Sequence, residues 1–173
     1  TLASTTRRLL CSSVSSTLNK RFSTNDKMLQ YDRFTVPIFT DTFFATAELG
    51  PSKQNYTMAQ IFVTDFGFTA CQLMKTKSEV PLAFSQFFKQ WGAPDKMIMD
   101  SAPEQISGES RQLLQQCDVT IHPLERDTPW SNRAEQAVNI IKTRVREQLR
   151  KTHCPMVLWC YCVEREANVL RSS

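Results

Sequence analysis

The chain has 173 residues, of which 21 are Lys or Arg and 17 are Asp or Glu, so its formal net charge is +4. With 41% apolar and 22% charged residues, and only 4 Gly and 8 Pro, its composition excludes a disordered, collagen-like or mucin-like protein. This length gives room for one domain with a proper core. No stretch approaches the roughly 20 apolar residues that a membrane-spanning helix needs, so we expect no membrane partner.

The positive charge is concentrated in two parts of the chain. Residues 1–34 hold six basic and two acidic side chains, and residues 126–151 hold seven basic and three acidic ones. Both segments are candidate nucleic-acid surfaces, although ordinary solvated faces can carry the same charge. The six cysteines stand at irregular spacings, which favours reduced thiols in an intracellular compartment over a disulfide framework.

Residues 1–33 form a basic segment that we expect to be the remnant of an upstream region. Its Ser, Thr and Arg residues, with no acidic residue before Asp26, are also typical of a mitochondrial transit peptide, and residues 5–18 fit a short basic helix. We expect residues 34–173 to form the folded domain, truncated at its C-terminus within a longer protein.

From residue 34 onward, hydrophobic periodicity predicts strands first. Alternating β-branched and aromatic residues favour three strands, and the turn residues between them favour an antiparallel meander. These strands are expected over residues 36–45, 56–65 and 68–75. A helix follows, with Ser78 as its N-cap, an apolar stripe that includes Val80 and Phe88, and Gly92 as its stop.

The second half of the chain alternates between short strands and helices. Short strands are expected over residues 95–100 and 119–124, with helices over 107–118, over 131–151 and after Pro155. The expected order of elements is therefore βββαβαβαα, without internal repeats. Such an order predicts an α/β domain with a mixed sheet flanked by helices.

Three acidic residues occupy unusual positions in this pattern. Asp41 interrupts the first apolar strand, Asp100 ends the fourth, and Glu135 lies in the first turns of the long helix. Clustered carboxylates repel one another unless a positive charge lies between them, and divalent metal ions with oxygen ligands are the usual solution. Two such ions, with Mg²⁺ expected, catalyse the in-line attack of water or a hydroxyl on a phosphodiester.

The long helix carries two distinct faces. Its predicted buried stripe consists of Ala134, Ala137, Val138, Ile141, Val145 and Leu149. The adjacent face consists of Glu135, Asn139, Lys142, Arg146 and Arg150, so it is acidic first, then polar, then basic. If Glu135 holds a metal ion, Lys142 and Arg146 are well placed to hold phosphates of a bound strand. Taken alone, the same spacing also fits ordinary ion pairing on an exposed helix.

Several segments resemble the catalytic core of retroelement integrases. They are FTDTFFA at 39–45, QIFVTDFGF at 60–68, the Lys-Ser-Glu step at 77–79, GAPDKMIMDSAPEQ at 92–105 and TPWSNRAEQ at 128–136. The resemblance covers roughly residues 20–170, includes RFSTNDKMLQY before the first strand, and is closest to copia-type LTR retrotransposons of the branch found in diatoms. It implies an RNase H-like α/β fold with a mixed five-stranded sheet, an antiparallel meander plus parallel strands, flanked by helices.

The resemblance also implies an activity, which is a metal-dependent polynucleotidyl transferase that processes 3′ DNA ends and joins them to target DNA. Asp41, Asp100 and Glu135 match the acidic triad, which would bind two Mg²⁺ or Mn²⁺ ions. The candidate DNA-contacting residues are Asn132, Arg133, Asn139, Lys142 and Arg146. The implied partners are the element's DNA ends, the target DNA and further copies of the chain in a homodimer or higher oligomer. The implied location is the nucleus.

The sequence departs from the family pattern at several places. Between Asp100 and Glu135 lie 34 residues, one fewer than is typical of the family, and the loop after Asp100 begins with Ser101-Ala102-Pro103. Arg133 replaces the Gly that is usual beside Asn132, and neither a His-His-Cys-Cys zinc module nor a C-terminal DNA-binding domain is present. These changes favour the alternative that the chain is a catalytically inactive nucleic-acid-binding or dimerisation remnant.

Other candidate sites in the sequence are weaker. Asp65 lies in an Asp-Phe-Gly step between two strands, where capping of a turn is the simpler explanation. Glu104 fits either an orienting residue or a surface residue. The group formed by His153, Cys154, Cys160 and Cys162 matches no standard zinc spacing, and helix packing explains it better.

Overall fold

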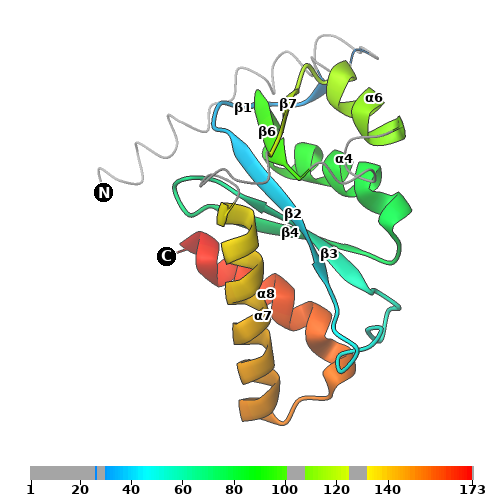
Figure 1. Ribbon diagram of the computed structural model, residues 1–173, viewed down its shortest axis with the longest axis vertical. Coiled ribbons are helices and arrows are strands. Elements are labelled where there is room, and N and C mark those ends of the chain that lie inside the picture. Colours follow the sequence, from blue (N-terminus) through cyan, green and yellow to red (C-terminus); the bar gives the residue numbers. More distant parts are fainter. Residues whose placement is uncertain (1–25, 27–29, 101–107, 125–131, 173) are drawn as a thin grey trace, which may run out of the picture.

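The computed structural model describes residues 26, 30–100, 108–124 and 132–172 (Figure 1). The strands are β1 (Arg33–Phe34), β2 (Ile38–Phe44), β3 (Met58–Val63), β4 (Thr69–Met74), β5 (Ala93–Pro94), β6 (Lys96–Met99) and β7 (Thr120–Pro123). The helices are α4 (Val80–Trp91), α6 (Gly108–Gln116), α7 (Asn132–Thr152) and α8 (Trp159–Ser172), with 3-10 turns at Lys77–Glu79 and Met156–Leu158. Every strand and helix expected from residue 34 onward is present.

Five strands form the central sheet in the order β4-β3-β2-β6-β7. β2, β3 and β4 pair in antiparallel fashion, whereas β6 pairs in parallel with both β2 and β7. The expected mixed sheet, a meander extended by parallel strands, is therefore confirmed. Thr40 on β2 lies opposite Met99 on β6. Because these two strands run in parallel, Asp100, which follows Met99, comes level with Asp41.

Helices cover both faces of this sheet and bury two apolar clusters (Figure 1). On one face α4 and α6 pack over a cluster that contains Phe62, Phe84 and Phe87, with the rings of Phe62 and Phe87 stacked at 4.1 Å between centroids. On the other face α7 and α8 pack over a cluster that contains Phe43 and Trp159. Alternation along β2 and β3 divides their side chains between the two clusters.

The structure adds a small sheet that the sequence did not predict. Arg33–Phe34 and Ala93–Pro94 pair in parallel as β1 and β5. Arg33 forms an ion pair with Asp95 at 2.6 Å and donates a hydrogen bond to the carbonyl oxygen of Cys117 at 2.6 Å. This arginine, expected to belong to a basic nucleic-acid surface, is therefore engaged within the fold.

The predicted N-cap Ser78 is wrong, because α4 begins at Val80 with Glu79 as its N-cap and Ser78 lies in the preceding 3-10 turn. The Ser78 hydroxyl instead shares a hydrogen bond of 2.7 Å with that of Thr76. A proline in the first turn of α4 lacks an N–H group, which reduces the need for a side-chain cap. The stop at Gly92 is confirmed.

Most of the basic N-terminal segment, including the expected helix over 5–18, lies outside the described residues. The division of the chain at residue 34 stays a prediction. Among the described residues, no helix is both long enough and apolar enough to cross a membrane. The five cysteines within the described ranges are free thiols.

Candidate active site

The first candidate carboxylate is held by the central strand. Asp41 lies opposite Ile61 of β3 and shares its face of β2 with Phe39 and Phe43. The two aromatic rings are almost completely buried, whereas Asp41 is half-buried. One oxygen of its carboxylate accepts a hydrogen bond of 2.7 Å from the main-chain N–H of Thr42. An acidic side chain thus stands in a row where packing alone would favour an apolar one.

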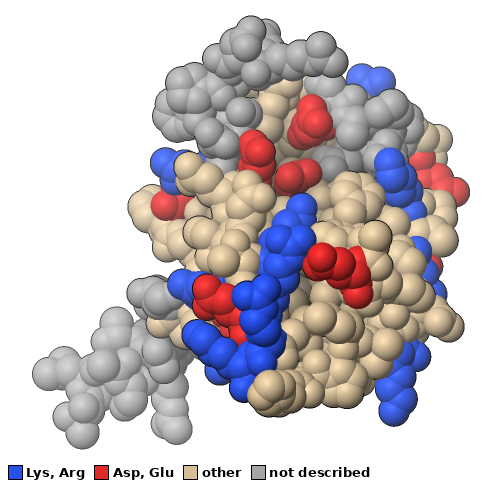
Figure 2. Space-filling view, turned by 60° about the horizontal axis from the view of Figure 1, so that its bottom comes forward, with Lys and Arg blue, Asp and Glu red and all other residues tan. Residues whose placement is uncertain are grey.

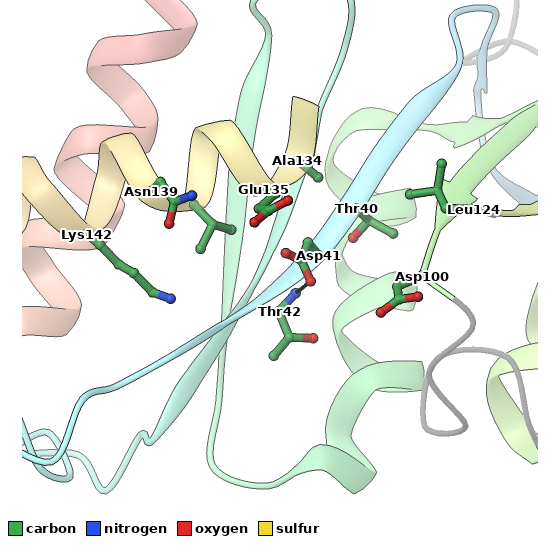
Figure 3. A pocket seen from close by; sticks show the side chains of 10 residues that line it. Thr40, Asp41, Thr42, Asp100, Leu124, Ala134, Glu135, Asn139 and Lys142 are labelled. Carbon is green, nitrogen blue, oxygen red and sulfur yellow. Dashed lines mark hydrogen bonds between the residues drawn. The ribbon is translucent and has the colours of Figure 1, made fainter. Parts of the chain in front are cut away.

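The third candidate carboxylate is oriented by the buried face of α7. All six residues of the predicted stripe are buried, and Ile141 and Val145 are fully so. Glu135 and Asn139 are exposed, and Lys142 is half-buried. The helical periodicity of the sequence therefore predicted the orientation of this helix correctly. With its stripe packed against β2 and β3, α7 directs Glu135 towards Asp41 (Figure 3).

The three candidate carboxylates line one pocket of about 440 Å³ (Figure 3). Asp41 comes from β2, Asp100 from the end of β6 and Glu135 from the first turns of α7. The other lining residues are Thr40, Thr42, Leu124, Ala134, Val138, Asn139 and Lys142. Residues that are 59 and 35 positions apart in the chain thus meet around one hollow.

The pocket is electrostatically unfavourable for Asp41. Burial raises the pKa of the Asp41 carboxyl, and the negative charges of Asp100 and Glu135 raise it further. The hydrogen bond from the main-chain N–H of Thr42 and the positive charge of Lys142 act in the opposite direction. Because the net shift is upward, the ionised form of Asp41 is destabilised in the folded protein. A cation in the pocket would relieve this penalty.

The carboxylates do not form a closed ligand cage. Within the described ranges, no group of three or more His, Cys, Asp or Glu side chains lies close enough to hold a metal ion. This finding applies equally to the weak zinc candidate at His153, Cys154, Cys160 and Cys162. The pocket nevertheless offers the right donors, because carboxylate oxygens are the ligands that Mg²⁺ and Mn²⁺ prefer.

Basic side chains lie next to the acidic pocket. Figure 2 shows Lys and Arg gathered into a stripe on one face of the molecule, with acidic side chains beyond one end. Lys142 on α7 lines the pocket, and its ammonium nitrogen lies 5.7 Å from the centroid of the Phe43 ring. Arg146 and Arg150 follow at one and two further turns and are exposed. The change from acidic to basic along this helix face is present as expected.

The five candidate DNA-contacting residues do not share one location. Asn139 and Lys142 line the pocket, whereas Arg146 is exposed outside it. Arg133 does not line the pocket and forms an ion pair with Asp65 in the turn between β3 and β4. The side chain of Asn132 lies outside the part that the structure describes, as do residues 101–107 with Glu104.

The side chain of Asp65, expected to cap a turn, forms an ion pair with a distant residue. Thr64, not Asp65, makes the hydrogen bonds of the turn, since its side-chain oxygen accepts from the main-chain N–H of Phe68 at 3.2 Å. The Asp65 carboxylate is paired with Arg133. These two residues are 68 positions apart, so no local sequence signal could have revealed their contact.

A buried polar network, on the face of β2 opposite to Asp41, was also not predicted from the sequence. The amide nitrogen of Gln60 donates a hydrogen bond of 2.6 Å to the hydroxyl of Thr40, and the hydroxyl of Thr42 donates one of 2.9 Å to the amide oxygen of Gln60. All three side chains are buried. Because Thr40 and Thr42 flank Asp41, this network fixes the backbone that carries the carboxylate.

No protein-family model matches the chain, and no curated protein matches it in sequence. Solved structures do match. The HTLV-2 integrase catalytic core domain in complex with magnesium, in its trimeric form, superposes with a TM-score of 0.59 at 18% identity, over 77% of this chain and 82% of that one. The catalytic core domain of BIV integrase gives 0.54 at 15% identity, over 81% and 83%.

A third match is the simian T-cell lymphotropic virus intasome in complex with a PP2A regulatory subunit, with a TM-score of 0.60 at 16% identity, over 92% of this chain and 61% of that one. The chain has the fold of a retroviral integrase catalytic core. The expected RNase H-like α/β fold is therefore confirmed. At 15–18% identity the likeness establishes the architecture alone.

Proposed function

We propose that this chain is the catalytic core of a retroelement integrase, a metal-dependent polynucleotidyl transferase that processes 3′ DNA ends and joins them to target DNA. One observation carries the proposal. In a fold shared with retroviral integrase cores, Asp41, Asp100 and Glu135 line a single pocket although they come from three separate elements. These are the positions that match the family's acidic triad in the sequence.

The carboxylate donors of the pocket suit Mg²⁺ or Mn²⁺, and we propose that two such ions bind there. Asp41, Asp100 and Glu135 supply only carboxylate oxygens. Burial first, and then the negative charges of Asp100 and Glu135, raise the pKa of Asp41, and a bound cation would offset both effects. Bound there, two ions would activate the attacking hydroxyl and stabilise the leaving oxygen. The HTLV-2 core at 18% identity was solved in complex with magnesium, which supports the same ion here.

The chain's own residues then bind and orient DNA. Lys142, at the edge of the pocket, would hold a phosphate next to the carboxylates, and Arg146 would hold the next one along α7. In end joining, the 3′ oxygen of the element forms a bond to a phosphorus of the target DNA, and its hydroxyl proton leaves to solvent. The bond from that phosphorus to the 3′ oxygen of the target strand breaks, and this departing oxygen takes up a proton from solvent to become a 3′ hydroxyl. Asn139 lines the pocket between Glu135 and Lys142, where its amide suits a contact to DNA.

Further features of the proposal follow from the sequence resemblance. They are an origin in a copia-type LTR retrotransposon of the diatom branch, assembly into a homodimer or higher oligomer, and action in the nucleus on chromosomal DNA. Similar cores are known in dimeric and trimeric forms for HTLV-2 and within an intasome for the simian virus, which supports assembly of more than one copy.

A disintegration assay on branched DNA with Mn²⁺ tests the activity, because disintegration, the reverse of strand transfer, depends least on flanking domains. Asp100→Asn is the control for the triad. Product that disappears in this variant supports the transferase. Folded wild-type protein that binds DNA without forming product would instead support the alternative, a catalytically inactive nucleic-acid-binding or dimerisation remnant.

Salt dependence tests the DNA surface separately from catalysis. Lys142→Ala should reduce the slope of log Kd against log salt concentration by roughly one, because one phosphate contact is lost. Lys89→Ala is a matched control that should leave the slope unchanged, since Lys89 is exposed on α4, which packs on the other face of the sheet. An unchanged slope for Lys142→Ala would remove this residue from the proposed contacts.

A further inference from the structure

One ion pair fastens the start of α7 to the rest of the fold. A terminal nitrogen of Arg133 contacts the Asp65 carboxylate and donates a hydrogen bond of 3.2 Å to the Asp65 main-chain carbonyl oxygen. The guanidinium carbon lies 5.8 Å from the centroid of the Phe39 ring. Phe39 is 2% exposed and stands two residues before Asp41 on β2. Arg133 therefore connects the helix that carries Glu135 with the strand that carries Asp41.

The turn that receives Arg133 is itself well fixed. The main-chain N–H of Thr64 donates to the carbonyl oxygen of Phe68 at 3.0 Å, and that of Gly67 donates to the carbonyl oxygen of Thr64 at 3.3 Å. Gly67 has a φ of +84°, a conformation that glycine adopts without strain. Because this hairpin end is closed by its own hydrogen bonds, Asp65 is a fixed partner.

Within the described part of the chain, the first turn of α7 is attached to the rest of the fold mainly through small side chains. The first N–H groups of a helix lack partners within the helix. Over residues 133–138 the buried side chains are Ala134, Ala137 and Val138, and the two alanines bury far less apolar surface than Ile141 or Leu149 further along. Glu135 stands between the two alanines. Its position therefore depends on the packing of these small side chains and on Arg133, which adds an ion pair to Asp65 in the turn between β3 and β4.

We propose that Asp65 and Arg133 are positioning residues that hold Glu135 against Asp41, and that Arg133 is not a DNA contact. Both residues line a separate groove of about 450 Å³, which also includes Gln136 and Ile140, and neither lines the pocket of the carboxylates. The effect of this pair on metal binding by Glu135 rests on the proposed function, whereas the attachment of α7 to the turn between β3 and β4 does not.

Two variants test the pair from its two sides. Arg133→Ala and Asp65→Asn should each raise amide hydrogen exchange at residues 135–139 by about 2- to 5-fold, the range expected for a partly exposed ion pair. Each should weaken the apparent Mn²⁺ affinity, read from the rise of Tm with Mn²⁺ concentration, by a similar factor. Charge reversal by Asp65→Arg together with Arg133→Asp should recover both values. Lys151→Ala, elsewhere on α7, should change neither.

The outcomes separate three roles for Arg133. If exchange rises while Mn²⁺ affinity stays unchanged, the pair is only structural and its role in positioning Glu135 is overturned. If Arg133→Ala weakens DNA binding while Asp65→Asn leaves exchange unchanged, Arg133 is a DNA contact and the proposal is also overturned. If the wild-type protein shows no Mn²⁺ effect, the proposed function fails, and hydrogen exchange alone decides whether the pair fastens α7.

Discussion

The rotation of α7 about its own axis decides whether Glu135 faces Asp41, and two adjacent isoleucines test it. Ile141 is 0% exposed in the cluster below α7, whereas Ile140 is 43% exposed. Ile141→Ala removes three buried carbon groups, worth about 2.4 kcal/mol at about 0.8 kcal/mol each, and the cavity left behind brings the loss to roughly 3–4 kcal/mol. Ile140→Ala should cost about 1 kcal/mol or less, because little burial is lost and Ala favours helix.

Urea and thermal unfolding, followed by circular dichroism, measure the difference between these variants. At about 2–4 °C per kcal/mol for a domain of this size, Ile141→Ala should lower Tm by roughly 6–16 °C and Ile140→Ala by at most about 4 °C. Equal losses, or a larger loss for Ile140→Ala, would refute the reasoning. Adjacent helical residues point about 100° apart, so such a result would mean that α7 is rotated and that Glu135 points away from Asp41.

Three other features of the fold give measurable consequences. Asp41→Asn should raise the free energy of unfolding at pH 7, as measured by urea unfolding. Because the pKa of Asp41 is higher in the folded than in the unfolded protein, the wild-type protein loses stability as pH rises above the unfolded pKa. Below about pH 4 the carboxyl is protonated in both states, and the free energies of unfolding of the two proteins should converge. Gly92→Ala should lower the free energy of unfolding by about 2–4 kcal/mol, because a Cβ at φ +105° would meet the Asp32 carbonyl oxygen at 2.7 Å. Gly50→Ala, at a positive φ but with open space around it, should lower it by only about 1–2 kcal/mol, and thermal unfolding measures both. Burial raises the pKa of Cys71 to about 12, so alkylation at pH 8, mapped by mass spectrometry, should be about a thousandfold slower than for a thiol of pKa 9; rapid labelling of folded protein would contradict this.

Local periodicity was enough to predict the elements that carry the candidate site. The 3.6-residue repeat of α7 fixed which residues it buries, and the apolar run of β2 revealed Asp41 as an interruption. A strand followed by Asp100 was recognisable in the same way. The three carboxylates could be predicted to lie close together from the sequence. Each one lies within or at the end of a strand or helix, and the arrangement of strands and helices in an α/β sheet is constrained.

Contacts between distant residues could not be predicted in this way. The pairing of β1 with β5 joins segments about 60 residues apart, each of only two residues, so neither segment has a periodicity to detect. Arg133, which stands where the family usually has Gly, was expected to contact DNA, but its guanidinium contacts Asp65. Side-chain partners of this kind depend on tertiary packing, which a local pattern does not contain.

Asp41 is the residue whose presence the fold explains least and the proposed chemistry explains best. Its neighbours on the same face of β2, Phe39 and Phe43, are buried, and an apolar residue between them would extend the core towards α7. The carboxylate instead has a raised pKa, which means that its ionised form destabilises the folded protein. A residue that opposes packing and lies in a pocket with two further carboxylates is the combination expected of a cation site. The cost in stability at Asp41 therefore supports the proposal that this pocket binds metal ions.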